Sequence, residues 1–131
     1  MLEKIVYNDM LYGLIIRKNF SNDHSKFFTD SKLQFQVGYI KYKAGETIQA
    51  HLHSKQERTV HLTPEFIFLK KGKVRVNFFS NDKILLGNVT LDALDCILLY
   101  NGAHSFDIIE DMELIEVKQG PYLEDQDKIK W

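Results

Sequence analysis

The sequence is poor in residues that cross-link or interrupt a chain. Its 131 residues include one cysteine, Cys96, and two prolines. A single cysteine excludes an internal disulfide, and its place in the apolar run Cys96–Leu99 predicts a packed core thiol. No apolar run approaches the roughly 20 residues that span a bilayer, and no segment resembles a secretory signal. We therefore expect a cytoplasmic protein with no membrane partner.

The sequence also has no excess of positive or of negative charge. Lysine and arginine number 17 and aspartate and glutamate 18, giving a formal net charge of −1. This balance gives no electrostatic reason to expect nucleic acid as a partner. Hydrophobic residues make up 44%, as in ordinary globular proteins. No linker or repeat is visible, so we expect one domain over residues 1–131, with an N-terminal extension (1–32), a barrel (about 33–118) and a C-terminal tail (119–131).

Short apolar runs separated by turn residues predict strands. Leu33–Lys43 alternates in polarity, and Thr47–His53 is expected to be the next strand. Two apolar runs, Glu65–Lys70 and Val74–Phe79, flank Gly72, which predicts a tight hairpin. Eight or so short strands without a convincing amphipathic helix predict an all-β sandwich or barrel. The remaining expected strands are Leu14–Ile16, Ile84–Thr90, Cys96–Leu99, Ser105–Ile109 and Glu113–Lys118.

Four side chains form a candidate metal site. His51 and His53 on one strand project from the same face, roughly 6–7 Å apart, and each imidazole nitrogen can lie about 2 Å from a shared ion. Glu65 opens a later apolar run, and His104 follows a Gly-Ala turn. An alternative carboxylate, Glu57, keeps a short spacing to the histidines but lies in a long loop. Since metal ligands need rigid support, we favour Glu65.

The pattern resembles the two motifs of the cupin superfamily. An inserted segment, Ser54–Pro64, separates the two halves of the first motif. The second motif is partly present from Asp95 to Phe106, without its usual proline and with the glycine-to-histidine spacing one residue short. The resemblance covers about Leu33–Lys118 and implies an all-β fold, a double-stranded β-helix (jelly-roll) barrel of the cupin type. The first motif is matched by Gly45, His51, His53, Glu65 and Gly72.

The resemblance to small single-domain cupins also implies a cofactor and a function. The cofactor is one divalent transition metal, Zn, Fe, Mn, Ni or Co, with coordination positions left for water or substrate. The expected function is action on a sugar or sugar phosphate, of isomerase or epimerase type, in carbohydrate or surface-polysaccharide metabolism. A metal-dependent dioxygenase and a non-catalytic metabolite-binding module are the alternatives.

Four further residues are candidates for contacting a sugar-like ligand. Arg58 in the insertion can clamp a planar anion or pair with Glu57 at the surface. Phe106 shares the face of His104 by strand alternation. Lys118 and Gln119 close the last strand, where a Gly-Pro turn that ends the sheet is the alternative explanation.

A homodimer is the expected assembly. Small cupins usually pair through strands, and the apolar segment Leu11–Ile16 is expected to add to the sheet of a second copy.

Overall fold

The computed structural model describes residues 2–124 and 128–131, and every regular element in them is a strand. The expected all-β class is therefore confirmed. None of these residues belongs to a helix long and apolar enough to cross a membrane. The strands are β1 (Leu2–Tyr7), β2 (Met10–Ile16), β3 (Lys26–Phe27), β4 (Gly38–Tyr39), β5 (Glu65–Phe79), β6 (Leu85–Asp92), β7 (Cys96–Leu99) and β8 (Ala103–Lys118).

The chain divides into two compact units. The sheet unit comprises residues 1–20 and 62–131, and the loop unit comprises residues 21–61. The sheet unit includes β1 and β2, which come from the segment expected to be an N-terminal extension. The expectation of a single domain over the whole chain stays a prediction.

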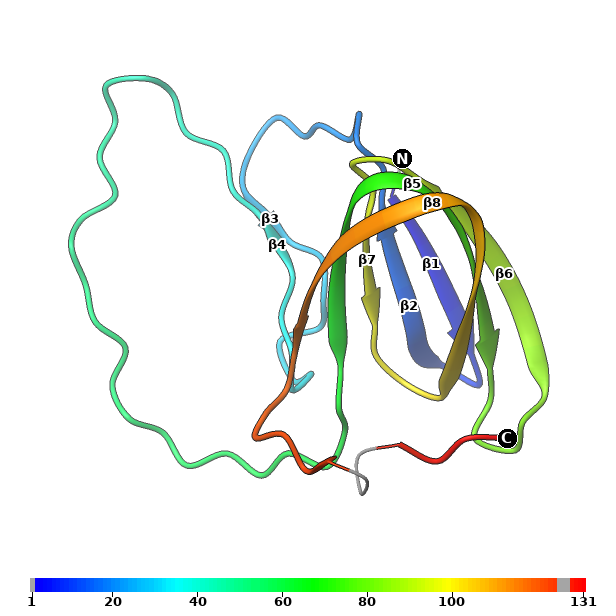
Figure 1. Cartoon of the computed structure of the whole chain (residues 1–131). Coiled ribbons are helices and arrows are strands. Elements are labelled where there is room, and N and C mark those ends of the chain that lie inside the picture. The colour runs from blue at the N-terminus through cyan, green and yellow to red at the C-terminus, as the bar shows by residue number, and fades with distance from the viewer. Residues whose placement is uncertain (1, 125–127) are drawn as a thin grey trace. The chain divides into compact units, whose positions relative to one another are not determined.

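One antiparallel sheet of six strands makes up the sheet unit, with β5 at its centre (Figure 1). One edge of β5 pairs with β8 along the whole strand, from Glu65 opposite Lys118 to Phe79 opposite Ala103. The other edge pairs first with β7 and then with β6. Beyond β7 lie β2 and β1. The sheet is strongly curled and forms a half-barrel.

The long strand β5 runs through Gly72 without reversing, so the predicted hairpin is wrong. Gly72 has a φ of +93°, and the register against β8 shifts between Leu69 and Lys71, between Lys71 and Lys73, and between Lys73 and Val74. Such bulges bend a strand and increase its twist. A glycine between two apolar runs is typical of a turn and of a bulge alike, so the sequence pattern does not separate the two.

The partner strands turn at the same place. β6 ends at Asp92 and β7 begins at Cys96. Between them, the Leu69 N–H donates to the Asp95 carbonyl (3.0 Å) and the Leu94 N–H donates to the Leu69 carbonyl (2.6 Å). β6 and β7 therefore act as one antiparallel partner of β5 that is interrupted by a corner. The sequence prediction is confirmed for β7 and nearly so for β6, whereas the two strands expected within residues 105–118 are one strand, β8.

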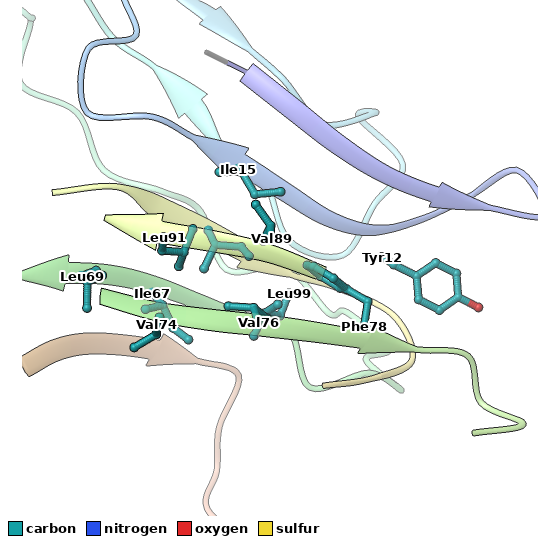
Figure 2. Close-up of a cluster of buried hydrophobic side chains, with 11 residues drawn as sticks. Tyr12, Ile15, Ile67, Leu69, Val74, Val76, Phe78, Val89, Leu91 and Leu99 are labelled. Carbon is teal, nitrogen blue, oxygen red and sulfur yellow. The ribbon is translucent and has the colours of Figure 1, made fainter. Parts of the chain in front are cut away.

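One face of the sheet, defined here as the inner face, carries the cluster of buried apolar side chains that forms the core (Figure 2). Residues directly opposite one another on paired strands share a face. Ile67 lies opposite Ile97 and Val76 opposite Val89, so each strand adds its alternate side chains to the same cluster. The buried members are Tyr12, Ile15, Ile67, Leu69, Val74, Val76, Phe78, Val89, Leu91, Ile97 and Leu99.

A buried carboxylate anchors the corner between β6 and β7. The Asp95 side chain is nearly inaccessible to solvent. It accepts hydrogen bonds from Arg17 Nη1 (3.0 Å), the Lys18 N–H (2.8 Å) and the Asp92 N–H (2.9 Å). Arg17 in turn donates from Nε to Glu3 (2.6 Å). Asp95 therefore ties the corner to the end of β2 and, through Arg17, to β1.

The loop unit contains only a short part of the strand expected over Leu33–Lys43, β4, and lacks the strand expected over Thr47–His53. Its one pairing joins β3 to β4, and residues 40–61 carry no strand. Around the first segment, the Gln36 amide donates to the Asp30 and Leu33 carbonyls (2.8 and 2.9 Å). Such local side-chain bonds compete with a sheet ladder. Alternating polarity alone supplies no partner strand, so the first of these predictions is confirmed for two residues only and the second is wrong.

The dimer contact expected from Leu11–Ile16 is also wrong. β2 contains this segment and is paired on both edges, with β1 on one side and β7 on the other. An interior strand has no free backbone groups to offer to a second sheet. The homodimer itself stays a prediction.

Replacing Gly72 tests the bend. Gly72→Ala is expected to cost about 1–3 kcal/mol of unfolding free energy for the positive φ alone, and more because the added Cβ would collide with the Asp111 carbonyl. Gly45→Ala is the matched control, since Gly45 has a φ of +91° with no atom near its Cβ position. Urea denaturation of both variants measures the difference. Equal losses would contradict the close packing of the bend.

Removing the Asp95 carboxylate tests the corner. Asp95→Ala removes one ion pair of the partly buried Arg17, leaves two backbone N–H groups without their acceptor and is expected to cost about 3 kcal/mol or more. Asp107→Ala is the control, because Asp107 forms an exposed ion pair with Arg75 (2.9 Å) and should change stability little. Urea denaturation compares the two variants, and a loss for Asp95→Ala no larger than the control's would refute the anchoring role.

Candidate functional site

A pocket of about 680 Å³ opens in the sheet unit. It receives side chains from β5 and β8, from the turn that joins β7 to β8, and from residues near the end of the sequence. Its volume lies within the range that is typical of small-molecule sites. The lining residues are Leu62, Thr63, Glu65, Phe79, Asn81, Tyr100, Gly102, Ala103, His104, Ser105, Phe106, Lys128, Ile129, Lys130 and Trp131.

Glu65 and His104 meet in this pocket from opposite ends of the β5–β8 ribbon. Glu65 lies opposite Lys118, whereas His104 lies opposite Phe78. In a flat ribbon these two positions would be about 40 Å apart, at roughly 3.3 Å per residue. In the structure His104 Nε2 lies 3.5 Å from Glu65 Oε2, because the ribbon bends at Gly72 and brings its two ends together.

Both side chains of this pair are mostly withdrawn from solvent. The Glu65 side chain is 13% exposed and that of His104 is 26% exposed. The His104 ring also packs edge-on against Phe106, with ring centroids 5.4 Å apart. The pair therefore combines one carboxylate and one imidazole at the wall of a pocket whose other lining residues are of mixed polarity.

A second carboxyl group stands beside Glu65. Burial by itself raises the pKa of Glu65, but hydrogen bonds with His104 and Glu116 and the positive charges of His104 and Lys118 lower it to about 2. The hydrogen bond with Glu65, together with burial and the negative charge of Glu65, raises the pKa of Glu116. Glu65 is therefore the more acidic of the two carboxyl groups.

Three of the remaining sequence candidates lie in the sheet unit. Phe106 lines the pocket beside His104. Lys118 lies opposite Glu65 in the register, and its Nζ is 5.5 Å from the centroid of the Tyr122 ring. Gln119 is not among the lining residues; its N–H donates to the Pro64 carbonyl (3.2 Å), which supports the alternative explanation of a strand end.

His51, His53, Glu57 and Arg58 belong to the loop unit and are exposed. The His51 and His53 rings lie edge to face with centroids 5.3 Å apart, although the segment is not the strand that was expected. Within neither unit do the described residues form a group of three or more His, Cys, Asp or Glu side chains that could hold a metal ion. Coordination of one ion by the four predicted ligands stays a prediction.

Sequence reasoning missed several residues of the site. Glu116 carries a signal, since strand alternation places it on the same face as Leu114, which packs against the core. Charges near a strand end are usually solvated, so the pattern alone did not single it out. Lys128 and Trp131 gave no signal, because no periodicity assigned the tail to any part of the sheet.

Comparison of the chain with protein-family models, curated proteins and solved structures gave no match. The resemblance to cupins therefore rests on the motif residues alone. The structure adds an all-β sheet that curls into a half-barrel.

The low pKa of Glu65 predicts a pH dependence of stability in chelator-treated protein. Its folded pKa of about 2 lies below the ordinary 4.5, so its contribution is complete above about pH 4.5 and is lost as the pH falls toward 2. Glu65→Gln should therefore give a shallower fall of unfolding free energy with decreasing pH in this window. Urea titrations at several pH values measure the slopes, and coinciding slopes would rule out the low pKa.

Proposed function

We propose that this chain is a small cupin-type protein that binds a divalent transition metal and a sugar-like small molecule at Glu65 and His104. The observation that carries the proposal is the 3.5 Å contact between these two side chains inside a pocket. A carboxylate oxygen and an imidazole nitrogen are donor types that suit Zn, Fe, Mn, Ni and Co. Glu65 and His104 are far apart in the sequence, so the fold brings the pair together.

The topology supports the finer fold proposal, a double-stranded β-helix. β5 and β8 form a long antiparallel ribbon that bends at Gly72, and β6 and β7 follow it around the same corner. A pair of strands that winds together around a core is the element from which such a barrel is built.

The donor set of the sheet unit fits a metal only in part. Glu65 and His104 supply two ligands, whereas structural and catalytic sites of this kind generally use three or four protein ligands. We propose that His51 and His53 supply the others. This part of the proposal rests on the motif in the sequence.

The proposed reaction class is isomerisation or epimerisation in carbohydrate or surface-polysaccharide metabolism. A bound divalent metal polarises a substrate carbonyl, which makes a neighbouring C–H bond more acidic. The residues of the pocket would hold the sugar against the metal, with Phe79 and Phe106 on its apolar edges and Ser105 available for hydrogen bonding.

A metal-independent binding module is the second candidate. It is favoured by the contact between Glu65 and His104 themselves, because a carboxylate and an imidazole that pair with each other need no ion between them. The dioxygenase alternative requires a redox-active metal, and the identity of the metal in the purified protein tests it.

Metal analysis of matched variants tests the proposal. His104→Ala and Glu65→Gln are expected to lower metal affinity at least tenfold, since each removes a ligand. His51→Ala and His53→Ala should do the same, and His24→Ala and Glu57→Gln serve as controls that retain the metal. Elemental analysis and competition with a chelator measure the loss.

Three results would each reject a different part of the proposal. Full metal content in His104→Ala would reject the metal site and leave the binding module. Metal loss in Glu57→Gln but not in Glu65→Gln would show that Glu57, and not Glu65, is the carboxylate ligand. A metal-loaded protein that promotes no solvent-deuterium exchange into any sugar phosphate would reject the isomerase class.

A further inference from the structure

The mouth of the pocket is lined by a segment to which the metal site assigns no role. Residues 128–131 belong to the pocket wall. Trp131 packs edge-on against Phe79, with ring centroids 5.6 Å apart and planes at 83°. The Nζ of Lys83 lies 5.4 Å from the centroid of the Trp131 ring. Contacts to the end of β5 and to the turn after it therefore hold this segment at the pocket.

Lysine side chains gather at this mouth of the pocket. Among the described lining residues Glu65 has the one acidic side chain, whereas Lys128 and Lys130 carry two ammonium groups. Lys128 also lies close enough to Glu116 for its charge to lower the pKa of that carboxyl group. Lys83 adds a further cation beside Trp131. This excess of lysine is local, since the whole chain has a net charge of −1.

The apolar side chains of the segment are left open to solvent. Ile129 is 89% exposed and Trp131 is 63% exposed, although both line the pocket. A ligand that filled the cavity would cover part of these surfaces, and burial of apolar area is favourable at about 25 cal/mol per Å². The segment therefore offers both charge and apolar contact to an occupant.

We propose that residues 128–131 form an anion subsite, in which Lys128 and Lys130 bind the phosphate group of a small phosphorylated ligand and Trp131 packs on its body. Two lysines suit a phosphate dianion. Each ammonium group acts as a point charge, so it can bind a phosphate oxygen without the fixed bidentate geometry that arginine requires. The cavity volume suits a small molecule and excludes a folded macromolecule. The inference rests on the proposed small-molecule function of this pocket and does not require the metal.

Tryptophan fluorescence of the full chain tests this subsite directly. Trp131 is the sole tryptophan in the sequence, so a change in emission reports on this segment. The probes are glucose 6-phosphate, ribose 5-phosphate, inorganic phosphate and unphosphorylated glucose, all at constant ionic strength. We expect a saturable change with the phosphorylated sugars and with inorganic phosphate, and at least tenfold weaker binding of glucose.

Paired lysine variants separate a built subsite from general charge. The double variant Lys128→Gln, Lys130→Gln is expected to raise the Kd for the phosphorylated probes at least tenfold. The control is Lys70→Gln, Lys71→Gln, which makes the same change of charge at exposed positions of the β5 bend and should leave the Kd unchanged. Calorimetry repeats both titrations. It also measures Trp131→Phe, which is expected to bind inorganic phosphate although it has lost the tryptophan fluorescence.

Several results would overturn the inference. These are the absence of saturable binding of every phosphate-bearing probe by both methods, equal weakening in the control pair, or glucose binding as tightly as its phosphate. The fate of the metal site is read separately. Phosphate binding without metal content would reject the metal and keep the subsite, whereas metal binding without phosphate binding would do the reverse.

Discussion

The bend of the β5–β8 ribbon at Gly72 is the constraint on which the rest of the structure depends. A straight ribbon of this length would hold Glu65 and His104 at opposite ends. The bulges around Lys71 curl the ribbon, so that its inner face closes on the core and its two ends come together at the pocket. Glycine is needed because the φ is positive and because the Asp111 backbone leaves no room for a Cβ. The backbone bend at Gly72 therefore determines how closely Glu65 and His104 approach each other.

The corner at Asp95 is the polar counterpart of this bend. A strand that follows a bent neighbour must break its own ladder, and the broken ladder leaves N–H groups that need acceptors. Asp95 supplies its carbonyl to Leu69 and its carboxylate to Asp92, Lys18 and Arg17. The core can therefore remain apolar on the inner face while the polar groups of the corner are satisfied by one residue.

The sequence predicted those parts of the fold that depend on local pattern. The all-β class and the strand Cys96–Leu99 followed from apolar runs and turn residues, and the shared face of His104 and Phe106 followed from alternation. It failed where the outcome depends on distant partners. Gly72 was taken for a turn because a bulge has the same local signature, and Thr47–His53 was taken for a strand although it has no partner. The sequence did not predict that Trp131 contacts the sheet, since this contact arises from packing alone.

β7 lies between two strands that come from very different parts of the chain. It is paired on one edge with β2, where Gly13 lies opposite Leu99, and on the other with β5. The β1–β2 hairpin precedes β7 in the chain, and a hairpin alone is at best marginally stable in water. Its second edge finds a partner only after β7 has been synthesised. Contacts of such large sequence separation slow folding, so the nascent chain presents an unpaired, apolar edge of β2 until β7 has been made.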